Sequence, residues 1–80
     1  MLKDDECFVI SNEVTKIGSK AFADCLFLTS ISIPENVNTI DKEAFLNCKN
    51  LKKVSFLGKV KEIGDSAFEY CLSLIIYSEV

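Results

Sequence analysis

The sequence predicts one small domain of the α/β class, built by stacking copies of a short strand-and-turn unit. Three observations indicate this fold. The chain has 80 residues, of which 49% are hydrophobic, with one proline and three glycines, so we expect it to fold. A shift of 23 residues brings six identical positions into register across three copies. Within each copy, an alternating strand pattern gives way to a compact turn pattern.

The repeat sets the organisation of the whole chain. Its six invariant columns are Val14/Val37/Val60, Ile17/Ile40/Ile63, Ala21/Ala44/Ala67, Phe22/Phe45/Phe68, Cys25/Cys48/Cys71 and Leu28/Leu51/Leu74. We predict a single domain over residues 1–80, comprising a partial repeat 6–13 and repeats 14–36, 37–59 and 60–80. One unit cannot close a core alone, so like residues must stack at about 4.8 Å per strand.

The first predicted elements are short strands. Residues 28–33 and 51–56 alternate apolar and polar side chains and contain β-branched or aromatic residues, which is typical of strands with one buried face. Phe8 and Ile10 lie one period earlier and predict a strand in the partial repeat. The last copy places Glu79 where an apolar strand residue is expected.

The second element of each copy is a short extended piece. Pro34, or Gly58 one repeat later, turns the chain after the strand. The extended piece that follows carries Val37 and Ile40 in the second copy.

The third element is predicted to be helical. Glycine or capping residues stand just before each Ala-Phe pair, at 18–19, 41–42 and 64–66. Such residues favour one or two tight helical turns, which we expect to end near the cysteine.

The composition excludes several classes of function. The chain has nine lysines, no arginine, no histidine, no tryptophan and a formal charge of −3. Without histidine it has no Ser-His or Cys-His nucleophile pair and no histidine-ligated metal. The acidic balance and the lack of arginine argue against nucleic acid as a partner. We therefore predict no catalytic residue, no metal site and no cofactor.

The cysteine column is the most chemically suggestive feature. We predict that Cys25, Cys48 and Cys71 are free thiols acting as small buried hydrophobes, each donating its S–H to a backbone carbonyl at the turn. Metal and redox roles are the alternatives, although a spacing of 23 residues matches neither a zinc pair nor a redox motif. Cys7 falls on the outward side of a strand and is predicted to react with alkylating agents. The phenylalanine column is predicted to be core and not a ligand platform.

The pattern Val-x-x-Ile-Gly-x-x-Ala-Phe-x-x-Cys-x-x-Leu-x-x-Ile-x-Ile-Pro, from Val14 to Pro34, resembles the BspA-like (Treponema pallidum type) leucine-rich repeats. The resemblance runs from about Phe8 to Tyr77. The departures are Asp41 in place of glycine, Phe56-Leu57 in place of Ile-Pro, and Glu79. The resemblance implies a right-handed leucine-rich-repeat solenoid of about 3.5 repeats with a short parallel sheet on its concave side. It also implies a cell-surface, adhesion-type role.

The candidate functional surface is the outward side of the strands, because alternation sends the intervening residues inward. Besides Cys7, it comprises Val9, Ser30, Ser32, Lys53, Ser55, Ile76 and Ser78. We expect a non-enzymatic interaction module that binds a protein partner through these residues. The alternative is a structural fragment of a longer repeat array with no independent activity.

Targeting signals are not visible in the sequence. The chain begins with acidic residues where a secretory signal would be basic, so a cytoplasmic location is the default expectation. The resemblance favours the cell surface if the chain is a fragment. No apolar run approaches the length of a membrane-spanning helix, so we expect no membrane insertion. The last copy has little polar sequence behind it, which predicts either self-association into a homo-oligomer through the C-terminal rung or a longer array.

Overall fold

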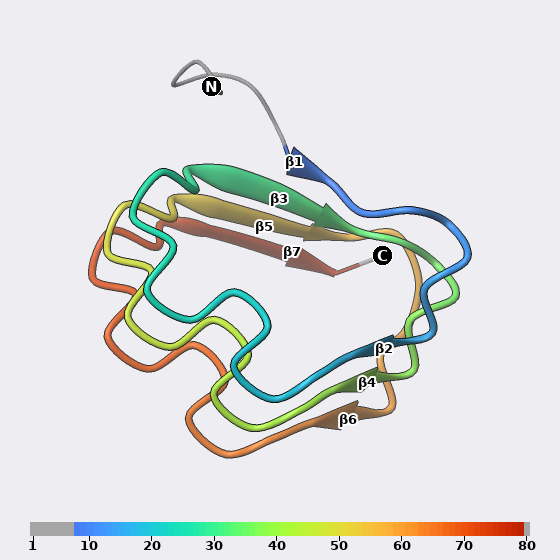
Figure 1. The fold of residues 1–80 in the computed structure, drawn as a ribbon. Coiled ribbons are helices and arrows are strands. Elements are labelled where there is room, and N and C mark those ends of the chain that lie inside the picture. The colour runs from blue at the N-terminus through green and yellow to red at the C-terminus, as the bar shows by residue number, and fades with distance from the viewer. Residues whose placement is uncertain (1–7, 80) are drawn as a thin grey trace.

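The computed structural model describes residues 8–79, including the side chains of residues 8–75. This part of the chain forms short parallel strands in two sheets (Figure 1). The four-stranded sheet has the order β1-β3-β5-β7 and the three-stranded sheet has the order β2-β4-β6. The strands are β1 Phe8–Val9, β2 Lys16–Ile17, β3 Ser30–Ile33, β4 Thr39–Ile40, β5 Lys53–Phe56, β6 Glu62–Ile63 and β7 Ile76–Glu79.

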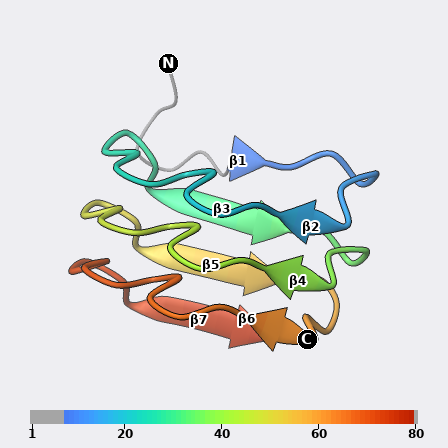
Figure 2. The same cartoon turned by 60° about the horizontal axis from the view of Figure 1, so that its bottom comes forward.

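The register of both sheets follows the 23-residue period of the sequence. Ile31 of β3 lies between Phe8 and Val54, and Ile40 of β4 lies between Ile17 and Ile63. Equivalent strands therefore lie side by side at successive levels (Figure 2). The predicted stacking of like residues is confirmed for these strands.

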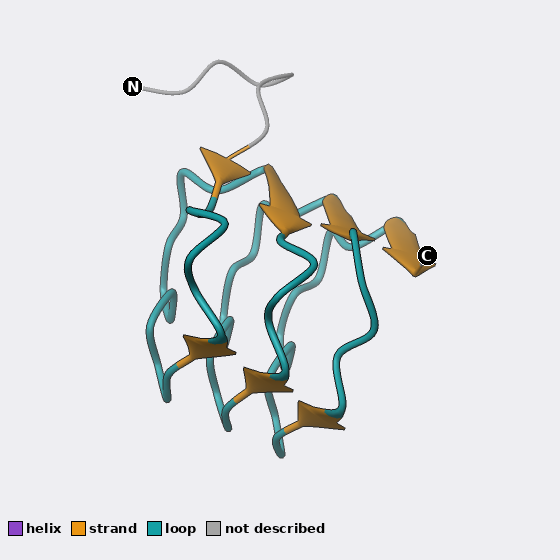
Figure 3. Cartoon of the chain, turned by 90° about the vertical axis from the view of Figure 1, so that its right-hand side faces the viewer, coloured by secondary structure: helices purple, strands orange, loops and turns teal. Residues whose placement is uncertain are grey.

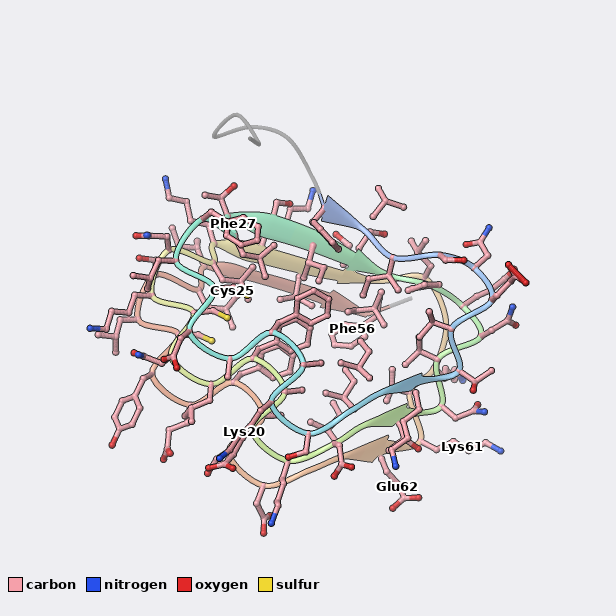
Figure 4. All side chains as sticks on the ribbon, in the orientation of Figure 1. Lys20, Cys25, Phe27, Phe56, Lys61 and Glu62 are labelled. Carbon is pink, nitrogen blue, oxygen red and sulfur yellow. The ribbon has the colours of Figure 1, made fainter. Side chains whose placement is uncertain are left out.

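The hydrophobic core fills the space between the two sheets, which lie on opposite sides of the molecule (Figure 3). Phe56 points from β5 into this space (Figure 4). The most deeply buried side chains come mainly from the repeat columns and include Leu28, Ile31, Ile33, Val37, Ile40, Ala44, Phe45, Cys48, Leu51 and Val54. The core thus comes mainly from the columns that the period predicts, but Ala21 and Ile63 of these columns are exposed.

The phenylalanine column forms a continuous aromatic stack through this core. The ring centroids of Phe22 and Phe45 are 5.2 Å apart, and those of Phe45 and Phe68 are 5.0 Å apart. The rings are nearly parallel, with interplanar angles of 2° and 3°. Phe45 is completely buried, and its neighbours are partly buried. The prediction that this column is core is confirmed.

The predicted helical turns are absent from residues 8–79, so the helical part of the α/β prediction was wrong. The turn segments 18–28, 41–51 and 64–74 consist of consecutive turns closed by bonds such as Ala21 N–H to Gly18 O, at 3.1 Å. A right-handed helix needs negative φ throughout. Positive φ angles recur in two columns of these segments, Lys20/Glu43/Ser66 and Asp24/Asn47/Tyr70.

Hydrogen bonds between neighbouring segments explain why no helix forms. The Phe22 N–H donates to Ala44 O at 2.7 Å, and the Phe45 N–H donates to Ala67 O at the same distance. Donors that a helix would use within one segment therefore bond to the next segment. Left-handed backbone costs about 1–2 kcal/mol per non-glycine residue. We infer that these bonds and the buried columns together offset that cost.

Candidate functional site

The outer face of the four-stranded sheet carries the residues that the sequence proposed as a binding surface. On β3 and β5, Ser32 and Ser55 remain partly accessible while their neighbours on either side are buried, which confirms the alternation. The register aligns Val9, Ser32, Ser55 and Ser78 in one row across the sheet. A second row contains Ser30, Lys53 and Ile76.

The described side chains of this face are hydroxyl, ammonium and apolar groups. Serine hydroxyls both donate and accept hydrogen bonds, and their small size lets another backbone approach closely. Lys53 is exposed and supplies a positive charge, and Val9 is 73% exposed and supplies an apolar contact. The whole chain contains no histidine that could activate a serine as a nucleophile.

The predicted thiol hydrogen bonds are confirmed for Cys48 and Cys71, and the predicted burial is complete only for Cys48, since Cys25 and Cys71 are partly buried. Cys48 Sγ donates to Phe22 O at 3.0 Å, and Cys71 Sγ donates to Phe45 O at 3.2 Å. Each accepting carbonyl lies in the preceding turn segment, so the thiols join neighbouring segments. The thiols of Cys25, Cys48 and Cys71 are free, as predicted, and Cys25 lies on the first turn segment (Figure 4). Cys7, predicted to be reactive, lies outside the described residues.

The environment of these thiols disfavours the thiolate. Burial raises the pKa of the Cys48 thiol to about 11. Burial also raises the pKa of Cys71, against the effect of a hydrogen bond. For Cys25, burial is the main cause of a raised pKa, and the Asp24 carboxylate adds to it. Because the thiolate is the nucleophile and the metal ligand, this column favours a structural role.

Within the described residues, two ion pairs join charged side chains of consecutive copies. Lys16 Nζ lies 3.5 Å from Asp41 Oδ2, and Lys20 Nζ lies 4.0 Å from Glu43 Oε1. The Lys42 N–H donates to Asp41 Oδ1 at 2.8 Å, and this bond is the main cause of the lowered pKa of Asp41. Both ion pairs are partly exposed and join consecutive copies.

No group of three or more histidine, cysteine, aspartate or glutamate side chains within the described residues could hold a metal ion. Nor does the described part of the chain contain a helix long and apolar enough to cross a membrane.

A shallow groove on the turn segments was not predicted from the sequence. It has a volume of about 500 Å³ and is lined by Asp24, Leu46, Asn47, Lys49, Tyr70 and Leu72. The residues are far apart in sequence but meet because the segments stack. The sequence feature that could have indicated this groove is the Asp24/Asn47/Tyr70 column. Its members occupy equivalent positions in the three copies but differ in polarity.

Comparison with protein families identifies a leucine-rich repeat family. The family model described as "BspA type Leucine rich repeat region (6 copies)" matches residues 5–77. No curated protein and no solved structure matches the chain. The matched residues include every described strand up to the start of β7 and all three turn segments.

Proposed function

The chain belongs to the BspA-type leucine-rich repeat family, and from this premise we propose that it is a non-enzymatic module that binds a protein partner. The proposed binding residues are Val9, Ser30, Ser32, Lys53, Ser55, Ile76 and Ser78. The observation that carries the proposal is the row of small polar residues on the outer face of the sheet. The side chains of Val9, Ser30, Ser32, Lys53 and Ser55 take no part in the core, which supports their availability for recognition.

The architecture we propose for the module is a right-handed solenoid of about 3.5 repeats, over the single domain 1–80 with the repeats 14–36, 37–59 and 60–80. Strand partners separated by 23 residues support this division. By family resemblance we propose an adhesion-type role at a cell surface.

The size of the face limits the strength of binding through it alone. The four short parallel strands of this sheet cover about 220 Å². A standard interface buries about 800 Å² on each partner. A firm complex through this face therefore has to extend onto neighbouring loops, or to use several copies of the module.

Charge substitution on the outer face tests the proposal. The wild-type chain and the double variant Ser32→Glu, Ser55→Glu are used to capture proteins from the native source, which are identified by mass spectrometry. A matched control, Thr15→Glu with Ser19→Glu, adds the same charge at exposed positions off this face. We expect a partner bound by the wild type and the control to be lost by the outer-face variant. Equal capture by all three chains would count against the outer face.

We further propose that the chain self-associates through its C-terminal rung. The supporting observation lies in the isoleucine column of β2, β4 and β6. Ile17 and Ile40 are 3% and 0% exposed, whereas Ile63 is 43% exposed. Sedimentation across a concentration series is expected to show association in the wild type and less association in Ile63→Lys. A wild-type chain that stays monomeric at high concentration would contradict self-association.

A further inference from the structure

The two ends of the stack differ in how well their apolar columns are covered. At the first level Ile17 is 3% exposed, and the ring of Phe8 packs edge-on against that of Phe22, with the centroids 5.6 Å apart. At the last level, which β6 and β7 form (Figure 2), Ile63 is 43% exposed although Ile40 one repeat earlier is completely buried. The last level therefore leaves uncovered an apolar side chain that the following repeat covers elsewhere in the stack.

The backbone of Ile63 faces the same uncovered edge. The Gly64 N–H donates to Ile40 O at 2.7 Å and the Glu62 N–H donates to Asn38 O at 3.1 Å, so both residues bond back to the β4 segment. Successive residues of a strand direct their backbone groups to opposite sides. The N–H and C=O of Ile63 therefore point away from β4, towards the free edge of the three-stranded sheet. A strand edge of this kind is a template for pairing with another chain.

The unequal strand numbers of the two sheets argue against head-to-tail docking of a second chain. If β2 of the second chain continued the order β2-β4-β6, its β3 would lie beside β7. Its β1, which lies one step before β3, would then fall at the position of β7 itself. If β1 paired with β7 instead, the place of one strand beside β6 would stay empty. Neither arrangement covers Ile63 without displacing a strand.

A two-fold axis through Ile63 avoids this conflict. Two β6 strands related by such an axis run antiparallel, and a residue on the axis of an antiparallel pair exchanges both N–H···O bonds with its own counterpart. Centring the pair on Glu62 would instead bring two carboxylates directly opposite each other. Centring it on Ile63 satisfies the outward backbone groups of both chains and continues the isoleucine column across the contact.

The charges on either side of Ile63 match this arrangement. Lys61 and Asp65 lie two residues before and two residues after Ile63, so the axis places Lys61 of each chain close to Asp65 of the other. Both side chains are exposed, and neither forms an ion pair with a described residue. Lys61 points away from the core (Figure 4), where it is free to reach a second chain. The contact thus pairs opposite charges twice.

We propose that the chain forms a two-fold dimer in which β6 pairs antiparallel with β6 of a second chain, with Ile63 at the axis and a Lys61–Asp65 ion pair on either side. This inference rests on the proposed self-association through the C-terminal rung and specifies its symmetry. The two larger dimensions of the molecule, 27 and 23 Å, limit the end face to about 600 Å² on each chain, near the lower end of specific interfaces. The dimer is therefore expected to be weak, and to stop at two chains because it uses the free edge of both.

Sedimentation of charge variants across a concentration series tests the symmetry. Lys61→Glu and Asp65→Lys each place like charges at both contacts, so each should weaken self-association at least about tenfold. An equal mixture of the two variants restores opposite charges at both contacts of the mixed dimer and should associate within about threefold of wild type. Lys49→Glu, the same charge change at an exposed turn position of the preceding repeat, should leave association unchanged. Circular dichroism should show similar thermal midpoints, because all three positions are exposed.

Carbodiimide cross-linking identifies the contact directly, because the reagent joins a lysine amine to a carboxylate that lies against it. In an equal mixture of ¹⁴N- and ¹⁵N-labelled chains, mass spectrometry recognises a cross-link between chains by the different labels of its two peptides. We expect a Lys61–Asp65 cross-link of mixed label in wild type, and its loss in Ile63→Lys.

The outcomes separate this inference from the proposal on which it rests. A wild-type chain that stays monomeric would overturn both the self-association proposal and the two-fold dimer. Growth beyond two chains, unchanged association in Lys61→Glu, or failure of the mixed variants to recover would overturn the two-fold dimer alone. Partner binding through the outer face is tested separately, because none of these substitutions lies on that face.

Discussion

The aromatic stack gives the sharpest test of how the fold is stabilised. Phe45 is fully buried and stacks on two rings, at centroid distances of 5.2 and 5.0 Å. Phe45→Ala removes a buried aromatic side chain, a change that costs about 3–5 kcal/mol. Each aromatic pair is worth about 0.5–1.5 kcal/mol beyond its burial, and two pairs are lost. We therefore expect the free energy of unfolding to fall by about 4–8 kcal/mol.

The expected loss of unfolding free energy in Phe45→Ala is large relative to the total stability of so small a chain. A chain with 80 residues is expected to have a total stability of about 4–12 kcal/mol. Phe45→Ala should therefore unfold the chain completely or leave it marginally stable. Phe45→Leu keeps most of the apolar volume and should lose about half as much stability, so it provides a measurable variant if the alanine variant is unfolded.

The assay is urea unfolding of the full chain followed by circular dichroism. Phe27→Ala is the matched control, because this phenylalanine is 56% exposed and outside the stack. The control should change the unfolding free energy by less than about 1 kcal/mol. A loss below about 1 kcal/mol in Phe45→Ala, or equal losses in both variants, would refute the claim that the stack organises the core.

Three further perturbations test individual contacts. Gly64→Ala should lower the unfolding free energy by about 1–3 kcal/mol, because a Cβ would collide with the Lys42 backbone. Gly18→Ala, which meets nothing within 4 Å, should stay within about 0.5 kcal/mol of wild type in the same urea assay. The Cys48 contribution to stability should be complete below its ordinary pKa of 9.0 and decline as the pH rises towards 11, by up to about 2–3 kcal/mol. Thermal unfolding should show this decline in wild type and a weaker one in Cys48→Ala. The lowered pKa of Asp41 predicts the opposite dependence, a loss of stability as the pH falls below 3.8, which should be smaller in Asp41→Asn when thermal midpoints are compared between pH 5 and pH 2.

The sequence predicted those parts of the fold and site that depend on spacing alone. The 23-residue period placed Ile31 beside Phe8 and Val54, and the alternation within a strand placed Ser32 and Ser55 on the outer face. The thiol ladder was also predictable, since a small residue with a weak donor recurred at a turn. The helical turns were not, because Ala-Phe after a glycine or a capping residue is equally compatible with a helix and with consecutive turns.

By itself, the sequence determined the period, the core columns and the family, because spacing and side-chain polarity are properties of the chain before it folds. Only the tertiary structure decided the backbone of the turn segments, where bonds such as Phe22 N–H to Ala44 O exist only after two segments stack. It also brought Asp24, Lys49 and Tyr70 together in one groove. The physical reason is the same in both cases: hydrogen bonds and grooves between copies arise from packing, which no single copy encodes.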